Sequence, residues 1–134
     1  MGLGGGLRAS PPKGRPDMSS TDFRIDPHPA MTPCDPGSAD AFTTDEISEA
    51  DHPHFEAPDE GISVGTWESA PCRRVIDSWP VHEMMTIVSG ALTLTHKDGR
   101  SENFGPGDTF YIAKGQYVVW EITEKLRKMY MIVG

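Results

Sequence analysis

Apolar and polar residues alternate in short runs from Gly61 to the C-terminus. Turn signals separate these runs every few residues, most clearly at Asp98-Gly99 and at Gly105-Pro106-Gly107. Asp-Gly suits the type I′ turn of a β-hairpin, because both residues tolerate positive φ angles. We predict strands over residues 62–68, 73–79, 82–89, 91–96, 101–104, 108–113, 117–123 and 126–133. Short strands at this spacing predict an all-β fold, a jelly-roll β-barrel.

The first 60 residues lack this alternation. They hold nine of the 12 prolines and six of the 14 glycines, which is the composition of an arm or a linker. We therefore divide the chain into a flexible Gly/Pro-rich and acidic arm (1–45), a linker (46–60) and the barrel (61–134). Because the arm has no apolar period to offset the entropy of ordering it, we expect deletion of residues 1–40 to cost little stability.

Charge is distributed as unevenly as proline. Residues 17–60 carry 12 acidic side chains against one basic side chain, whereas residues 61–134 balance eight against eight. The net charge of −8 therefore comes from the N-terminal part. An acidic arm would repel the phosphates of a nucleic acid, so we expect no nucleic-acid partner.

No apolar run approaches the roughly 20 residues that cross a bilayer, and Met1 to Arg15 lacks the apolar core of a secretory signal. We therefore expect no membrane association and a cytoplasmic protein. The two cysteines, Cys34 and Cys72, are too few for a disulfide framework or a zinc site, so we expect free thiols. Arg73 and Arg74 beside Cys72 would lower the pKa of its thiol.

The alternation along each strand also predicts which side chains face the interior of the barrel. If Glu83 faces inward, Met85 and Ile87 do as well, while His82 and Met84 face the solvent. On two other strands the same rule groups Val75, Asp77 and Trp79, and Val118, Trp120 and Ile122. The interior is then mainly apolar, with two tryptophans and two carboxylates, as small-molecule pockets commonly are.

Two segments carry a family resemblance. Residues 83–90 read E-M-M-T-I-V-S-G, and residues 107–115 read G-D-T-F-Y-I-A-K-G. They resemble the two half-motifs of the cupin β-barrel. Further matching pieces are Gly65-Thr66-Trp67-Glu68, Phe104-Gly105-Pro106-Gly107-Asp108, Trp120-Glu121 and Arg127-Lys128-Met129-Tyr130. The stretch 61–133 is thus similar to the small single-domain cupins grouped with the ethanolamine-utilisation cupin and the cupin domain of (S)-ureidoglycine aminohydrolase.

The resemblance implies a metal site that this chain fills only in part. In the aminohydrolase, the metal ligands are a glutamate, two histidines and a glutamine around manganese. Counted along this sequence, those positions are Asp77, Trp79, Glu83 and Val118, of which only Glu83 keeps a ligand of the usual type. Two carboxylates without a nitrogen ligand argue against ureidoglycine hydrolysis.

Three interpretations of Asp77 and Glu83 are open. They could coordinate a divalent metal such as manganese, which accepts oxygen ligands. They could act as a metal-free acid/base pair. Alternatively, Glu83 is a structural hydrogen-bond acceptor and Asp77 lies half-exposed at the barrel mouth. Lys128 could offer its ammonium to a carboxylate ligand, or it could form a surface ion pair with Glu121 or Glu124.

His52 and His54 have a spacing that suggests metal ligation, but Pro53 between them indicates a loop, so we expect an exposed linker.

The resemblance implies a small-molecule-binding cupin of the ureidoglycine-aminohydrolase-like group, and the expected lining agrees with small-molecule binding. It would be either a weakly metal-dependent enzyme or an accessory protein in nitrogen or amine catabolism. The alternative is a non-catalytic ligand sensor or a structural cupin that has lost its metal site. The expected ligand pocket includes Trp79, Met85, Val118, Trp120 and Lys128. Because the barrel is small and leaves strand edges to cover, we also expect a homodimer.

Overall fold

The computed structural model describes residues 23–134. Apart from two short 3-10 helices, η1 (Ala39–Ala41) and η2 (Pro58–Glu60), its regular elements are strands. The strands are β1 (Thr32–Pro33), β2 (Glu49–Ala57), β3 (Ile62–Ser69), β4 (Cys72–Ile76), β5 (His82–Thr95), β6 (Ser101–Phe104), β7 (Thr109–Ile112) and β8 (Val118–Val133). Their pairings are antiparallel. The all-β prediction is confirmed.

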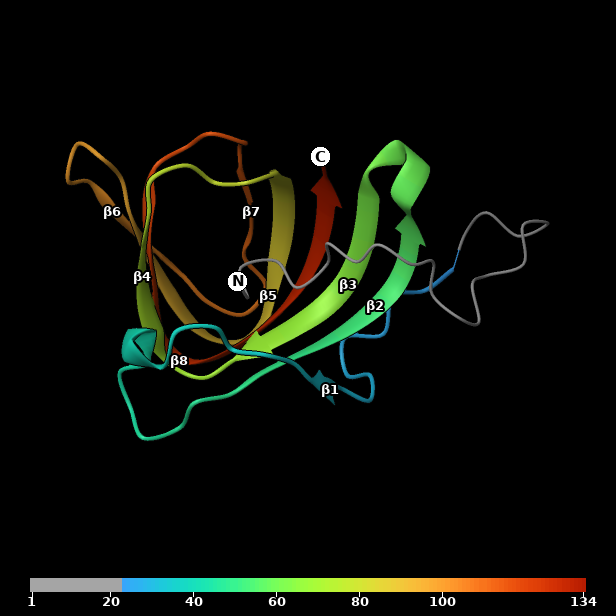
Figure 1. Ribbon diagram of the computed structural model, residues 1–134, viewed down its shortest axis with the longest axis horizontal. Helices are drawn as coiled ribbons and strands as arrows, with labels where there is room; N and C mark the ends of the chain where they lie inside the picture. The colour runs from blue at the N-terminus through green and yellow to red at the C-terminus, as the bar shows by residue number, and fades with distance from the viewer. Residues whose placement is uncertain (1–22) are drawn as a thin grey trace.

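The two long strands, β5 and β8, lie at the centre of the fold (Figure 1). The strand order is β1-β2-β3-β8-β5-β6, with β4 added beside β8 and β7 beside β5. One half of β8 pairs with β4 and with the end of β5, and the other half pairs with β3 and with the start of β5. Because both long strands pass from one sheet to the other, they join two curved sheets that enclose a common interior.

The sequence predicted two strands, 82–89 and 91–96, where the structure has the single strand β5. It likewise predicted two strands, 117–123 and 126–133, where the structure has the single strand β8. In β5 the interruption is a bulge, where the register with β8 shifts between Ser89 and Ala91. Gly90 has a φ of 90° there, and a Cβ on it would overlap the carbonyl oxygen of Lys125. Only glycine fits this position, and the bulge lets the strand bend without ending.

Residues 46–60 are not a linker, which corrects the prediction. They contain β2, which pairs with β3. Its three acidic side chains, Glu49, Asp51 and Glu56, are buried. The strand was not predicted because its inward-facing positions are acidic. Alternation indicates a strand when the inward-facing positions are apolar.

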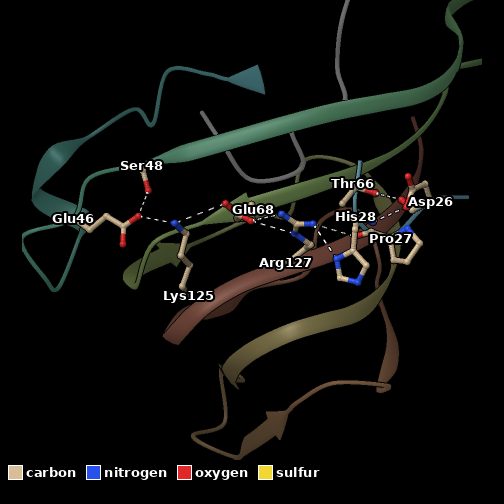
Figure 2. A network of polar contacts seen from close by, with 9 residues as sticks. All are labelled: Asp26, Pro27, His28, Glu46, Ser48, Thr66, Glu68, Lys125 and Arg127. Atoms are coloured by element: carbon tan, nitrogen blue, oxygen red, sulfur yellow. Dashed lines mark hydrogen bonds and ion pairs between the residues drawn. The ribbon is translucent and has the colours of Figure 1, made fainter. Parts of the chain in front are cut away.

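Residues 26–48, called the strap below, are bonded to the outside of the barrel. Figure 2 shows the polar network that holds both of its ends, from Glu46 and Ser48 through Lys125, Glu68 and Arg127 to Pro27, His28, Asp26 and Thr66. The strap also pairs β1 with β2. This part of the expected flexible arm is therefore attached, while residues 1–22 of the arm lie outside the described residues.

Tryptophan side chains fill much of the space between the two sheets. The ring centroids of Trp67 and Trp120 lie 6.2 Å apart, and those of Trp79 and Trp120 lie 5.4 Å apart. Alternate residues of β5 and β8, including Met85, Ile87 and Ile132, pack around them. The interior is thus dense and largely apolar.

Candidate functional site in the barrel interior

A fully buried ion pair lies between the two central strands. Glu83 stands near the start of β5, and Lys128 stands on the neighbouring half of β8. The Nζ atom of Lys128 lies 2.6 Å from Oε2 of Glu83, and both side chains are 0% exposed. Burying either charge alone would be costly, so the two groups require each other.

The ammonium of Lys128 is also surrounded by aromatic rings. Its Nζ lies 4.8 Å from the ring centroid of Trp67, 4.9 Å from that of Trp120 and 5.8 Å from that of Tyr130. The sulfur of Met85 is 3.5 Å away. Aromatic faces attract cations within about 6 Å, and the attraction is stronger in a desolvated place. The arrangement is an aromatic cage closed around an internal cation.

The acidic residues of β2 extend this polar cluster. The hydroxyl of Tyr130 donates to Oδ1 of Asp51 at 3.0 Å, and Nε1 of Trp67 donates to Oε2 of Glu49 at 3.0 Å. Both cage residues are therefore fixed by carboxylates that lie behind them. The sequence did not predict these contacts. The feature that could have indicated them is the pair of acidic residues at the alternate positions 49 and 51, which share one face of a strand.

Tyr130 is held in its protonated form. Burial raises the pKa of its phenol far above the ordinary value, and the carboxylates of Asp51, Glu83 and Glu56 raise it further. An ionised Tyr130 would place another negative charge in a buried acidic cluster. The hydroxyl therefore acts as a hydrogen-bond donor across the accessible pH range.

Oε1 of Glu83 and Nε1 of Trp79 are among the buried polar atoms that have no hydrogen-bond partner in the described part of the chain. The Trp79 ring packs on Trp120, and the Lys128 ammonium that bonds Glu83 lies over the Trp120 ring. Buried polar atoms are normally hydrogen-bonded. The carboxylate oxygen accepts and the indole nitrogen only donates, so a molecule that meets both must offer a donor and an acceptor.

Two loops meet beside this cluster. The backbone N–H of Trp79, between β4 and β5, donates to the carbonyl of Gln116 at 2.8 Å, and the N–H of Gly115 donates to the carbonyl of Trp79 at 2.8 Å. The second loop lies between β7 and β8. The two loops lie at the end of the barrel where β5 begins (Figure 1). These two bonds join the loops at this end of the barrel.

The structure brings together most of the residues that the sequence predicted. The buried set includes the ion pair and four of the other expected lining residues, Trp79, Met85, Val118 and Trp120. His82 and Met84 are exposed, as the alternation predicts. Of the two alternatives for Lys128, the surface ion pair with Glu121 or Glu124 is wrong, since its ammonium is buried beside Glu83.

Asp77 is not brought to Glu83, and its predicted inward position is wrong. Strand β4 ends at Ile76, which is buried, and Asp77 lies exposed in the bend that follows. On β4 it is Cys72 and Ile76 that face inward, while Val75 is 55% exposed. The prediction assigned the odd-numbered positions of this strand to the interior, whereas Cys72 and Ile76 face it. It also extended the strand beyond its end at Ile76.

The remaining sequence-based expectations about reactive groups change as well. Burial raises the pKa of the Cys72 thiol, and this effect exceeds the lowering by Arg74. The expectation of a lowered pKa is therefore wrong. His52 and His54 lie on β2 rather than in a linker, where Nε2 of His54 is 2.8 Å from Oγ1 of Thr66.

The sequence matches the family model of the EutQ-like cupin domain over residues 56–130. The chain belongs to this cupin family. The jelly-roll barrel expected from the half-motifs is thereby confirmed. No curated protein has a significant match with this sequence. In residues 23–134, no helix is both long and apolar enough to cross a membrane.

Solved structures support the same fold. A protein of unknown function from Pseudomonas syringae pv. tomato is 26% identical with a TM-score of 0.73, over 81% of this chain and 46% of that one. The chain therefore spans about half of that protein's length. The EutQ protein of Clostridium difficile is 17% identical with a TM-score of 0.58, over 75% of each chain. A putative ethanolamine utilization protein Q from Salmonella typhimurium is 15% identical with a TM-score of 0.54, over 64% of this chain and 69% of that one.

Proposed function

We propose that this protein is a small-molecule-binding cupin of the ureidoglycine-aminohydrolase-like group, acting in nitrogen or amine catabolism. Its binding centre is the buried pair of Glu83 and Lys128. The observation that supports this proposal is the coexistence of a fully buried ion pair with an unused acceptor on Glu83 and an unused donor on Trp79.

The two unused atoms indicate the class of ligand. The oxygen of Glu83 needs a donor such as an amide or amine N–H, and the indole N–H of Trp79 needs an acceptor such as a carbonyl oxygen. Small amides and ureas carry both groups on adjacent atoms. The apolar lining by Trp120 and Met85 favours a compact ligand with few other polar groups.

The donor set does not fit a divalent metal. Of the four positions that the resemblance to the aminohydrolase assigns to metal ligands, Asp77 is exposed, while Trp79 and Val118 offer no ligand atom. Glu83 is bonded to the Lys128 ammonium. Within residues 23–134, no group of three or more His, Cys, Asp or Glu side chains is placed to hold a metal ion, and protein metal sites normally use at least three.

Glu83 and Lys128 can serve as the acid/base pair that the sequence assigned to Glu83 and Asp77. The carboxylate would accept a proton from a ligand N–H, and the ammonium would donate one to a ligand oxygen. The alternative function is a non-catalytic sensor or structural cupin. It is favoured by the closure of the loops at Trp79 and Gly115 and by the complete burial of the pair.

Ligand screening by thermal shift tests the proposal. N-carbamoylglycine, acetamide and ethanolamine are added separately at millimolar concentration, with and without manganese. Three proteins are compared: wild type, the double variant Glu83→Met/Lys128→Met, and the control Glu68→Gln, which alters the strap network only. The double variant removes both charges together, so that neither is left uncompensated.

We expect the amide or ureido probe to raise the melting temperature of wild type and Glu68→Gln, to leave the double variant unchanged, and to act equally without manganese. A wild type that responds to none of the probes, or a double variant that responds like wild type, would overturn the binding centre in favour of the structural alternative.

A further inference from the structure

Histidine side chains hold the N-terminal part of the strap, residues 26–34, against the outside of the barrel. His28 belongs to the strap itself, and its Nδ1 lies 3.2 Å from a guanidinium nitrogen of Arg127 on β8 (Figure 2). A guanidinium group only donates hydrogen bonds, so Nδ1 of His28 is the acceptor and carries no proton. Protonation of His28 would therefore replace this hydrogen bond by two cations in contact.

Two histidines of β2 hold the strap from the barrel side. Nδ1 of His52 lies 2.9 Å from the carbonyl oxygen of Ala30, which only accepts, so this nitrogen carries the proton. Nε2 of His54 lies 2.8 Å from Oγ1 of Thr66, and that hydroxyl donates to the carbonyl oxygen of Asp26 at 3.4 Å. The centroids of the two imidazole rings are 4.9 Å apart. Each neutral ring has one unprotonated nitrogen, and two charged rings at this distance would repel each other.

Few negative charges stand near these rings to balance added protons. The charged side chains of the network in Figure 2 around this part of the strap are Asp26 on the strap, Glu68 on β3, and Lys125 and Arg127 on β8. Glu68 is already paired with Arg127 at 2.8 Å and lies 3.8 Å from Lys125. Asp26 accepts the backbone N–H of His28 at 2.8 Å. Of the two carboxylates in this described group, only Asp26 has no basic side chain bonded to it.

The surroundings of His54 oppose its protonation while the strap is in place. Burial lowers the pKa of its imidazole below the ordinary value, the neighbouring His52 lowers it further, and Asp26 opposes these effects only in part. A histidine whose pKa is lowered in the folded structure binds a proton more readily once that structure opens. Proton uptake and release of the strap are therefore linked.

We propose that residues 26–34 form a pH-sensitive latch, which is closed at neutral pH and released at mildly acidic pH, when His28, His52 and His54 become charged. The C-terminal end of the strap stays attached. There Nζ of Lys125 lies 2.8 Å from Oε2 of Glu46, and this hydrogen bond lowers the pKa of the Glu46 carboxyl. The pair therefore stays ionised over the range in which histidines titrate.

Release of the latch opens the edge of β2 that β1 covers. Thr32 of β1 is paired with Asp51 of β2, and the carboxylate of Asp51 accepts the hydroxyl of Tyr130 in the interior. The latch thus connects the pH of the surroundings with the wall of the cage around Lys128. The proposal does not depend on the ligand proposed for the interior.

Hydrogen–deuterium exchange of the full chain, measured by mass spectrometry, tests the latch. Exchange of residues 28–34 is compared at about pH 7.5 and about pH 5.5, on either side of the ordinary histidine titration, relative to the intrinsic exchange rate at each pH. A histidine that binds its proton only after release favours the released strap by about tenfold over this range. We therefore expect the protection of this segment, which includes the Cys34 N–H bonded to Glu49, to fall by about tenfold or more. Residues 82–95 of β5 should remain strongly protected at the lower pH, which separates release of the strap from unfolding of the barrel.

Replacement of the histidines assigns the effect. The triple variant His28→Gln/His52→Gln/His54→Gln should show the same protection of residues 28–34 at both pH values, because glutamine keeps hydrogen-bonding groups but takes up no proton. Each single variant should lose less protection than wild type. The control is His96→Gln in the β5–β6 hairpin, where His96 contacts Glu102, and it should respond as wild type does.

Three results would overturn the latch. The first is a wild type whose protection of residues 28–34 is the same at both pH values. The second is a triple variant that keeps the full pH response, and the third is a set of single variants that all respond as strongly as wild type.

Discussion

Replacing Lys128 by methionine should destabilise the protein strongly, although methionine fits an aromatic cage well. The volume is nearly kept and the apolar side chain suits Trp67 and Trp120. The substitution nevertheless removes the cation that lies 2.6 Å from Glu83. The carboxylate is 0% exposed, so water cannot replace the lost partner without opening the barrel.

The expected magnitude follows from this burial. Removing one partner of a buried ion pair costs about 3–5 kcal/mol, because an uncompensated charge is left behind. A chain of this size loses about 4 °C in melting temperature per kcal/mol. We therefore expect Lys128→Met to lower the melting temperature by about 12–20 °C. Glu83→Met should fall in the same range, because it leaves the ammonium without its carboxylate.

The double variant Glu83→Met/Lys128→Met gives the decisive comparison. With both charges absent, neither desolvation penalty remains, so stability should return to within about 1–2 kcal/mol of wild type. Urea unfolding followed by tryptophan fluorescence measures all four proteins in one double-mutant cycle. Two results would contradict this dependence of each charge on the other. One is a loss of unfolding free energy in the double variant equal to the sum of the losses in the two single variants; the other is a loss below about 1 kcal/mol in Lys128→Met.

Three further predictions concern other groups. Tyr130 should stay protonated in the folded protein, so the stability that it contributes is present below about pH 10 and is lost at higher pH. Tyrosinate absorbance should therefore show one additional ionisation only when the protein unfolds. This additional ionisation should be missing in Tyr130→Phe. Burial, assisted by His52, lowers the pKa of His54, so stability should fall as pH drops below about 6.5, and less so in His54→Gln. Deletion of residues 1–40 removes β1 and several strap hydrogen bonds, each of which stabilises the fold by about 1 kcal/mol. The melting temperature should therefore fall by about 10 °C or more, contrary to the expectation from the sequence. An unchanged melting temperature would show that the strap does not stabilise the barrel.

The interior face of β5 was predictable because the strand is regular where the motif begins. The pairing with β7 runs from Glu83 to Thr86 without a shift, so alternation correctly placed Glu83, Met85 and Ile87 inside. The same rule failed for Asp77, because it cannot detect that β4 ends at Ile76. Alternation predicts which side chains face inward only within the residues that form the strand.

The partner of Glu83 could not be predicted from the sequence. Lys128 lies opposite Ile87 in the register of β5 and β8, and reaches Glu83 from there. Alternation within one strand gives no information on the register between two strands that are far apart in the sequence. The inward carboxylates of β2 were missed for a different reason. Hydropathy recognises an inward face by apolar residues, and it gives no signal when the interior is itself polar.

The interior ammonium gives Glu83 a partner, while the other positions that the resemblance to the aminohydrolase assigns to metal ligands hold Asp77, Trp79 and Val118. A divalent ion needs several protein ligands, and this interior supplies one inward carboxylate from those four positions. A lysine ammonium needs only one carboxylate and aromatic faces, and Lys128 has both. Unlike a metal ion, this cation is tethered to β8 and cannot be lost to a chelator. Chelation should therefore leave the stability of the protein unchanged.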